Sequence, residues 1–218
     1  MDAADFSKGA EMKFLKLIIV VALAMAAVWG SAEAVADDKK MDGKKEVATL
    51  AGGCFWCLEA MFEELNGVKN VESGFSGGAA HSTYKEVCAG TTGHAEVISI
   101  TYNADLITYR DILTIFFGTH DPTTLNRQGA DVGTQYRSAI FYHDESQKQA
   151  ADEAIALLEK EKVFDNPVVT EVVMFKEFVV ADDRHQDYYV QNQTQGYCTA
   201  VITPKMIKFR KEFADKLK

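Results

Sequence analysis

The feature that most constrains the fold is Gly-Gly-Cys-Phe-Trp-Cys at residues 52–57, which joins two different patterns. Residues 47–51 are typical of a short strand, and the apolar residues of 58–65 recur at helical spacing. Cys54 is therefore predicted at a strand-to-helix turn, next to the amino end of the helix. Unpaired backbone N–H groups and the helix dipole at that end favour a thiolate, which is the nucleophilic form of cysteine.

Phe55 and Trp56 follow the cysteine directly. Two aromatic side chains beside a nucleophile are suited to line a pocket for a small apolar group. The alternative is that both aromatic residues belong to the core and that Cys54 and Cys57 form a structural pair.

Composition limits what these thiols do. The hydrophobic content of 47% is that of a soluble globular protein, and the formal net charge of -9 argues against a nucleic-acid partner, which needs a basic face. Four cysteines are too few for a disulfide scaffold in 218 residues, and no second Cys-x-x-Cys or paired histidines complete a zinc site. Redox chemistry without a metal is therefore favoured for the four thiols, which are Cys54, Cys57, Cys88 and Cys198.

The first 36 residues are interpreted as a secretory signal peptide. A short basic segment begins at Met12, which is an alternative start of translation, and an apolar run follows at 17–30. Small-x-small patterns at 32–34 and 34–36 offer cleavage sites. An uncleaved amino-terminal anchor is the competing interpretation. Residues 37–45 are charged and predicted as a linker, so the working domain is expected to span 46–218.

Strands and helices intermingle in this domain without regular alternation, which predicts an α+β two-layer sandwich. Strands are predicted at 68–75, 95–102 and 136–142, and at 168–173 and 176–180 as a hairpin or as neighbours. Further helices are predicted at 108–118, 144–163, 182–193 and 204–217, and loops at 79–88, 120–131 and 194–200.

Glu96 is the candidate proton donor. Alternation along its strand places it on one face with Ile98 and Ile100. A carboxyl group on an apolar face is costly unless it is neutral or paired, and burial raises its pKa. The alternative is a glutamate at the strand edge with a salt bridge to a basic residue, for which Arg137 is available. Tyr84, Tyr136 and Asp131 are further polar candidates on neighbouring loops.

Five motifs together resemble the A-type peptide methionine sulfoxide reductases over residues 48–211. The motifs stand in that family's order: Gly-Cys-Phe-Trp at 53–56, Gly-His-Ala-Glu at 93–96, His-Asp-Pro-Thr at 120–123, Asn-Arg-Gln-Gly at 126–129 and Asp-Val-Gly-Thr-Gln-Tyr-Arg-Ser at 131–138. The resemblance implies a ferredoxin-like α-β plait with a mixed sheet and an irregular C-terminal segment. It also implies reduction of the S epimer of methionine sulfoxide, free or in proteins, with no metal or other cofactor.

The resemblance implies a role for each matching residue. Cys54 corresponds to the nucleophile and Glu96 to the acid that binds and protonates the sulfoxide oxygen. Tyr84 and Tyr136 match the tyrosines that hold this oxygen, and Asp131 matches the acidic residue that orders the site. Phe55 and Trp56 match the pair that lines the pocket for the substrate's methyl group.

A second thiol must condense with the sulfenic acid that Cys54 becomes, and an external thioredoxin-like dithiol then reduces the disulfide. Cys198 resembles the resolving cysteine of many members and is favoured, because a loop can move towards the sulfenic acid. Cys57 is the alternative, since it departs from the glycine often found there and lies one helical turn from Cys54. Cys88 is interpreted as structural.

Reduction of methionine sulfoxide in oxidised proteins is the leading hypothesis for the function. The alternatives are a general thiol-disulfide oxidoreductase that uses Cys54 and Cys57, and a non-catalytic binder of oxidised methionine. The protein is expected to be a secreted or periplasmic monomer with no stable membrane anchor.

Overall fold

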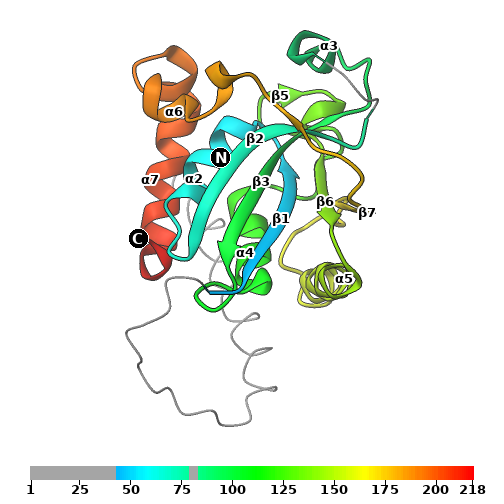
Figure 1. The fold of residues 1–218 in the computed structure, drawn as a ribbon. Helices are drawn as coiled ribbons and strands as arrows, with labels where there is room; N and C mark the ends of the chain where they lie inside the picture. Colours follow the sequence, from blue (N-terminus) through cyan, green and yellow to red (C-terminus); the bar gives the residue numbers. More distant parts are fainter. Residues whose placement is uncertain (1–42, 79–82) are drawn as a thin grey trace.

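The computed structural model describes residues 43–78 and 83–218 (Figure 1). The predicted signal peptide at 1–36 lies outside the described residues, as does most of the predicted linker at 37–45. In chain order the elements are β1 (Lys45–Gly52), α2 (Phe55–Glu63), β2 (Val68–Ser76), α3 (Tyr84–Cys88), β3 (Ala95–Asn103), α4 (Tyr109–Thr119), β4 (Arg127–Gln128), β5 (Asp131–Val132), the 3-10 turn η1 (Thr134–Tyr136), β6 (Ser138–Tyr142), α5 (Glu145–Lys160), β7 (Glu171–Met174), β8 (Val179–Val180), the 3-10 turn η2 (Asp183–His185), α6 (Tyr188–Gln191), the π-helical η3 (Cys198–Ile202), α7 (Thr203–Glu212) and the 3-10 turn η4 (Ala214–Lys216).

Six strands form one mixed sheet in the order β7-β6-β1-β3-β2-β8. Each neighbouring pair among β6, β1, β3 and β2 is antiparallel, whereas β7 pairs parallel with β6. Helix α2 connects β1 to β2, and α4 lies between β3 and β6 in the chain. This is the split βαβ arrangement of the ferredoxin-like fold. The predicted α+β plait with a mixed sheet is therefore confirmed.

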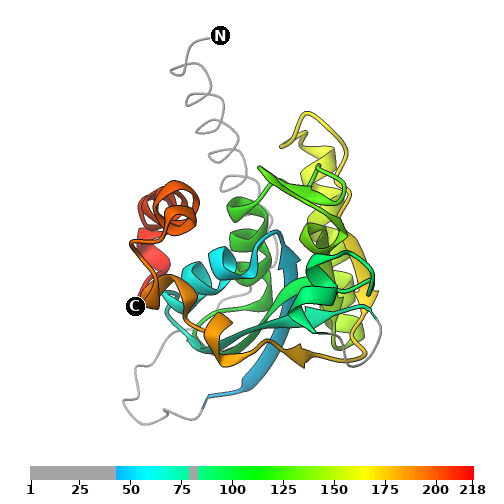
Figure 2. The ribbon, with the colours of Figure 1, turned by 90° about the horizontal axis from the view of Figure 1, so that it is seen from above.

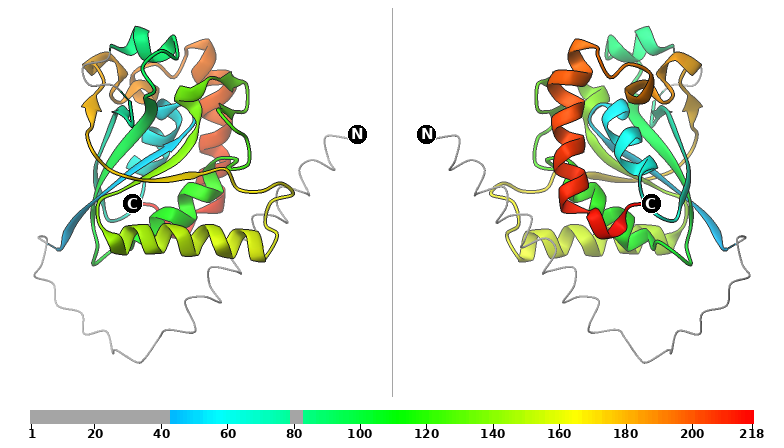
Figure 3. Two further views of the ribbon diagram at one scale, coloured as in Figure 1. Left: turned by 90° about the vertical axis from the view of Figure 1, so that its right-hand side faces the viewer. Right: turned by 90° about the vertical axis from the view of Figure 1, so that its left-hand side faces the viewer.

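Four helices cover one face of the sheet. Apolar side chains of α2, α4, α5 and α7 pack in one cluster with those of the central strands. Helices α4 and α5 start where polar caps stand in the sequence, at Thr108 with its capping box to Asp111 and at Asp144. Figure 3 shows α5 lying crosswise at one end of the sheet, beside α4. The helices predicted at 108–118 and 144–163 are thus present.

The two edge strands come from one short segment. Strand β7 extends the sheet beyond β6, and β8 extends it beyond β2, at the opposite edge. Both arrangements predicted for 168–173 and 176–180, a hairpin or two adjacent strands, are therefore wrong. The connection crosses the sheet face opposite the helices (Figure 2), where Phe175 and Phe178 cover a small apolar cluster around Val97. A hairpin and a connection that crosses the sheet from one edge to the other have the same sequence pattern, because each joins two short strands by a few residues.

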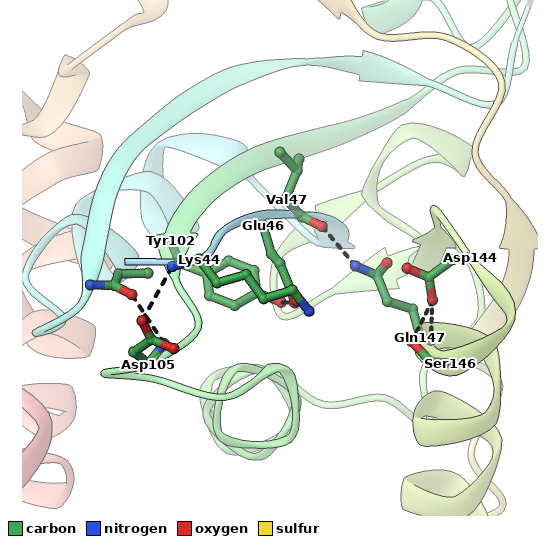
Figure 4. Close-up of polar contacts among 9 residues, drawn as sticks. Lys44, Glu46, Val47, Tyr102, Asp105, Asp144, Ser146 and Gln147 are labelled. Atoms are coloured by element: carbon green, nitrogen blue, oxygen red, sulfur yellow. Dashed lines mark hydrogen bonds and ion pairs between the residues drawn. The ribbon is translucent and has the colours of Figure 1, made fainter. Parts of the chain in front are cut away.

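Polar contacts fix the start of β1 at the end of the sheet near α5 (Figure 4). The Tyr102 hydroxyl donates to Glu46 Oε2 at 2.8 Å. The Gln147 side chain donates from Nε2 to the Val47 carbonyl oxygen at 2.8 Å, and its backbone N–H donates to the Asp144 cap at 2.9 Å. One glutamine thus joins the first turn of α5 to β1.

The C-terminal part of the chain, from β8 to α7, closes over α2. A buried carboxyl group marks this contact: Glu59 of α2 is 1% exposed and faces the backbone N–H groups of Asp187 and Tyr188 at the start of α6. Burial raises the pKa of Glu59 to about 7, although Ser73 and these N–H groups lower it. Glu59 is therefore neutral below pH 7 and becomes a buried carboxylate above it.

The raised pKa of Glu59 predicts a stability that falls with rising pH. The contribution is fully present below the usual pKa of 4.5 and is lost as pH rises through about 7, because the folded state holds this proton more tightly. We expect the melting temperature to fall between pH 5 and pH 8, and to fall less in Glu59→Gln. Circular dichroism melts measure this, with the exposed Glu72→Gln as the control. Parallel pH curves for the wild type and Glu59→Gln would contradict the assignment.

Candidate active site

Cys54 lies at the turn between β1 and α2, as the sequence predicts. Gly53 makes this turn with a φ of 100°, a conformation that favours glycine. A Cβ atom there would lie 2.6 Å from Cβ of Gln128, so the close approach of these segments also requires glycine. Cys54 is the N-cap residue, and its carbonyl oxygen accepts hydrogen bonds from the N–H groups of Cys57 and Leu58.

The Cys54 thiol is buried. Burial raises its pKa well above the usual value, Cys57 and Glu96 raise it further, and the Tyr197 hydroxyl lowers it. The prediction that the helix end makes Cys54 a thiolate is therefore wrong for the free protein. The physical reason is burial of the thiol. No capping hydrogen bond to the Cys54 side chain offsets it, because the N–H of Phe55, the first of the helix, donates to Glu96 instead.

Glu96 is a buried acid that remains protonated at neutral pH. Its Oε2 accepts the Phe55 N–H at 3.1 Å, on the helix-facing side of β3 that also carries Ile98. Burial raises the pKa of Glu96 to about 8; the Phe55 N–H lowers it, and the negative charges of Asp131 and Cys57 raise it. A proton donor therefore stands at the start of the helix that Cys54 caps.

The alternative of a salt-bridged glutamate at the sheet edge is wrong. Strand β3 is central, and Arg137 is directed elsewhere. Its Nε donates to Glu171 at 3.2 Å, and its terminal nitrogens donate to the carbonyl oxygens of Thr134 and Gly93. Arg137 thus ties β6 to β7 and to the turn before Glu96.

Phe55 and Trp56 have different surroundings. Phe55 is buried, with ring centroids 5.7 Å from Phe75 and 6.3 Å from Tyr84. Trp56 is half-buried and stacks on Tyr188, with centroids 3.7 Å apart and planes 8° apart. Phe55 therefore packs among buried aromatic rings next to Cys54, whereas Trp56 is partly open to solvent.

Three more predicted residues lie near Glu96 and Cys54, carried by short elements at the end of the sheet where α3, β5 and α6 gather (Figure 1). Tyr84 begins α3, in a segment predicted as a loop; Tyr136 ends η1, and Asp131 lies in β5. Burial raises the pKa of both tyrosines, and the charge of Glu96 raises each further. Both phenols are therefore neutral hydrogen-bond donors close to the same carboxyl group.

The structure adds residues that sequence reasoning missed. The His185 ring lies 4.1 Å from that of Tyr84, and the Tyr197 hydroxyl donates to Asp131 Oδ2 at 2.7 Å. Tyr197 also interacts with the Cys54 thiol. The available signal was the density of aromatic residues at 182–193 and after it, but no periodicity directs that segment to the site.

All four cysteines are unbonded. Cys57, in the first turn of α2, interacts with the Cys54 thiol and accepts a hydrogen bond from Lys205, whose Nζ lies 3.8 Å from its Sγ. Cys198 is fully buried in η3, which continues into α7, so the loop predicted there is wrong. Cys88 is exposed at the end of α3 and is not part of the core.

The site thus combines a buried thiol, a neutral carboxylic acid, two phenols and an aromatic surface, a set of groups suited to thiol-dependent chemistry. In residues 43–78 and 83–218, no group of three or more His, Cys, Asp or Glu is arranged to hold a metal ion. Within the same described part of the chain, every helix is too short or too polar to cross a membrane.

Comparisons with known proteins agree on one family. The model of the family described as peptide methionine sulfoxide reductase matches residues 46–217. The chain is 54% identical to the peptide methionine sulfoxide reductase MsrA of Chromobacterium violaceum, over 79% of this chain and 98% of that protein. It is 53% identical to MsrA of Deinococcus radiodurans, over 80% and 85%.

Solved structures show the same relationship. The reduced form of Mxr1 from Saccharomyces cerevisiae superimposes with a TM-score of 0.65 and 33% identity, over 73% of this chain and 92% of that one. Methionine sulfoxide reductase A of Corynebacterium diphtheriae gives 0.63 and 31%, over 72% and 78%. The chain therefore belongs to the peptide methionine sulfoxide reductase family. It is an A-type enzyme, which reduces the S epimer of methionine sulfoxide to methionine at the expense of thiols, and the two alternative functions have no counterpart among these relatives.

The turn before Cys54 gives a prediction. Gly53→Ala places a Cβ at positive φ and against Gln128, so we expect a loss of about 1–3 kcal/mol in the free energy of unfolding. Urea unfolding measures it. Gly129→Ala is the matched control, because it has a φ of 61° with nothing within 4 Å of the added Cβ. Equal losses in the two variants would contradict the close approach as the cause.

Proposed function

We propose that Cys54 is the nucleophile and Glu96 the proton donor of this reduction. The observation that carries the proposal is the hydrogen bond from the Phe55 N–H to Glu96 Oε2, which holds a neutral acid beside the thiol. A sulfoxide is a poor electrophile until its oxygen is protonated, so an acid of raised pKa activates it. The Cys54 sulfur attacks the sulfoxide sulfur and gives up its proton, the protonated oxygen passes from that sulfur to Cys54 as the sulfoxide S–O bond breaks, and methionine leaves. The sulfoxide is thereby reduced to methionine, and Cys54 is oxidised to a sulfenic acid.

The other residues of the site position the substrate. Tyr84 and Tyr136 donate hydrogen bonds to the sulfoxide oxygen, and Asp131 orders the site through the Tyr197 hydroxyl. Phe55 and Trp56 supply the apolar surface that accepts the methyl group.

The sulfenic acid must be resolved by a second thiol, and Cys57 and Cys198 are the two choices. The disulfide formed is then reduced by an external thioredoxin-like dithiol, which completes the cycle without a metal or another cofactor. Substrates are free methionine sulfoxide and oxidised methionine in proteins, and the enzyme acts as a monomer. This assignment makes the protein a repair enzyme for oxidative damage.

The leader supports a proposal that this repair takes place outside the cytoplasm. A basic start, an apolar run at 17–30 and small-x-small sites at 32–36 support a cleaved signal peptide and a secreted or periplasmic enzyme. The working domain then begins near residue 46, and its reductant is an exported thioredoxin-like protein.

The role of Glu96 predicts both a rate and a pH profile. We expect Glu96→Gln to slow single-turnover formation of methionine between about 10²-fold and 10⁴-fold at pH 7, because the amide donates no proton. In the wild type the rate should fall above about pH 8, as Glu96 loses its proton. Rapid-quench assays with an S-sulfoxide peptide measure both, with Glu72→Gln as the control. A wild-type rate in Glu96→Gln would sink the assignment.

The leader predicts a processed product. Full-length chain expressed in a bacterium with two membranes should be recovered in the periplasmic extract, with the intact mass of a protein cut after residue 34 or 36. Leu23→Arg interrupts the apolar run and should keep the chain in the cytoplasm. Recovery of uncut protein in the membrane fraction would favour the anchor instead.

A further inference from the structure

The two cysteines of the Cys-x-x-Cys are already neighbours. The Cys57 N–H donates to the Cys54 carbonyl oxygen at 3.1 Å, and the two thiols interact. Residues three apart on a helix have Cβ atoms about 5–6 Å apart, and a disulfide needs about 3.5–4.5 Å. A small adjustment of the first turn of α2 is therefore enough to join the two sulfurs.

The ammonium group of Lys205 in α7 contacts the Cys57 sulfur. Lys205, near the start of α7, places Nζ 3.8 Å from the Cys57 Sγ. An ammonium group only donates hydrogen bonds, so this contact is strongest with a thiolate. The other groups that face Cys57 are Cys54, the Tyr197 hydroxyl and Asp131.

Together these groups lower the pKa of Cys57 below the usual value of a cysteine. The hydrogen bond with Cys54 lowers the pKa of Cys57 to about 7; burial raises it, Lys205 and Tyr197 lower it, and Asp131 raises it. Of the two thiols, Cys57 therefore loses its proton more readily, whereas burial raises the pKa of Cys54.

Cys198 is less suited than Cys57 to attack the sulfenic acid. It is fully buried, burial raises its pKa, and it lies in helical backbone, where the Thr199 N–H donates to the Gln195 carbonyl oxygen at 2.9 Å. Cys57 is among the groups that influence its pKa. Cys198 is therefore a buried thiol that is held in helical backbone directly before α7.

We propose that Cys57 is the first resolving thiol and that Lys205 positions and activates it. The inference rests on the proposed role of Cys54 as the nucleophile that becomes a sulfenic acid. The Cys57 thiolate attacks the Cys54 sulfur, an S–S bond forms, and the Cys54 S–O bond breaks. The leaving hydroxide takes a proton from solvent and departs as water. Cys57 is oxidised, and the sulfenic sulfur of Cys54 is reduced, to the disulfide level.

A single-turnover experiment on the full domain tests this. Fully reduced protein without added dithiol is mixed with an S-sulfoxide peptide, quenched at intervals by alkylation, and analysed for methionine and for mapped disulfides. The first disulfide should be Cys54–Cys57. Lys205→Met should slow its formation about tenfold at pH 7 and recover towards pH 9, where the thiolate forms without help. Lys205→Arg should restore most of the rate.

Lys208→Met is the matched control, since Lys208 is exposed, lies one turn further along α7 and pairs with Glu212 at 3.6 Å. Cys57→Ser should accumulate a sulfenic acid that a sulfenic-acid-specific reagent traps. A first disulfide of Cys54–Cys198, or a Lys205→Met rate equal to wild type at every pH, would overturn the inference while leaving the reductase intact. No methionine from the wild type would instead remove the proposed function itself. Melting temperatures of all variants separate loss of the thiolate from loss of the fold.

Discussion

The hydrogen bond between the Phe55 N–H and Glu96 Oε2 is the contact on which the rest of the site depends. It joins the central strand β3 to the first turn of α2, and it uses a helix donor that would otherwise need another partner. Because the same contact lies in a buried environment, the carboxyl group is held in place and kept neutral. The hydrogen bond thus fixes the position of the acid, whereas burial, which outweighs the effect of that bond on the pKa of Glu96, keeps the acid neutral.

The same contact explains why the Cys54 thiol behaves differently from its sequence prediction. A helix end has few free N–H groups, and one of them donates to Glu96 rather than to the cysteine. Burial then dominates at Cys54, while Cys57, three residues later, receives the ammonium group of Lys205. The pKa values of two thiols in one turn are therefore shifted in opposite directions, because each thiol is surrounded by side chains from different parts of the fold.

Local sequence patterns correctly predicted the features that depend on neighbouring residues, such as turns, strand alternation and helix caps. The glycines before Cys54, the alternation around Glu96 and the caps of α4 and α5 placed these elements and the side of the sheet on which Glu96 lies. The errors concern long-range placement. Nothing local distinguishes a hairpin from a crossing between β7 and β8, or shows that Tyr188 stacks on Trp56 and that Cys198 is helical. Those features depend on which surfaces meet after the sheet has formed.

The crossing between the edge strands has a consequence for how the enzyme becomes active. All six strands are complete at residue 180, but Tyr188, Tyr197 and Lys205 all follow it in the chain. A ribosome therefore produces the whole sheet, with its reactive thiol, before it produces the residues that cover that thiol. Contacts between the start and the end of a chain also form slowly, since long loops must close first. The strands of the sheet and Cys54 therefore all precede, in order of synthesis, the residues that surround the thiol.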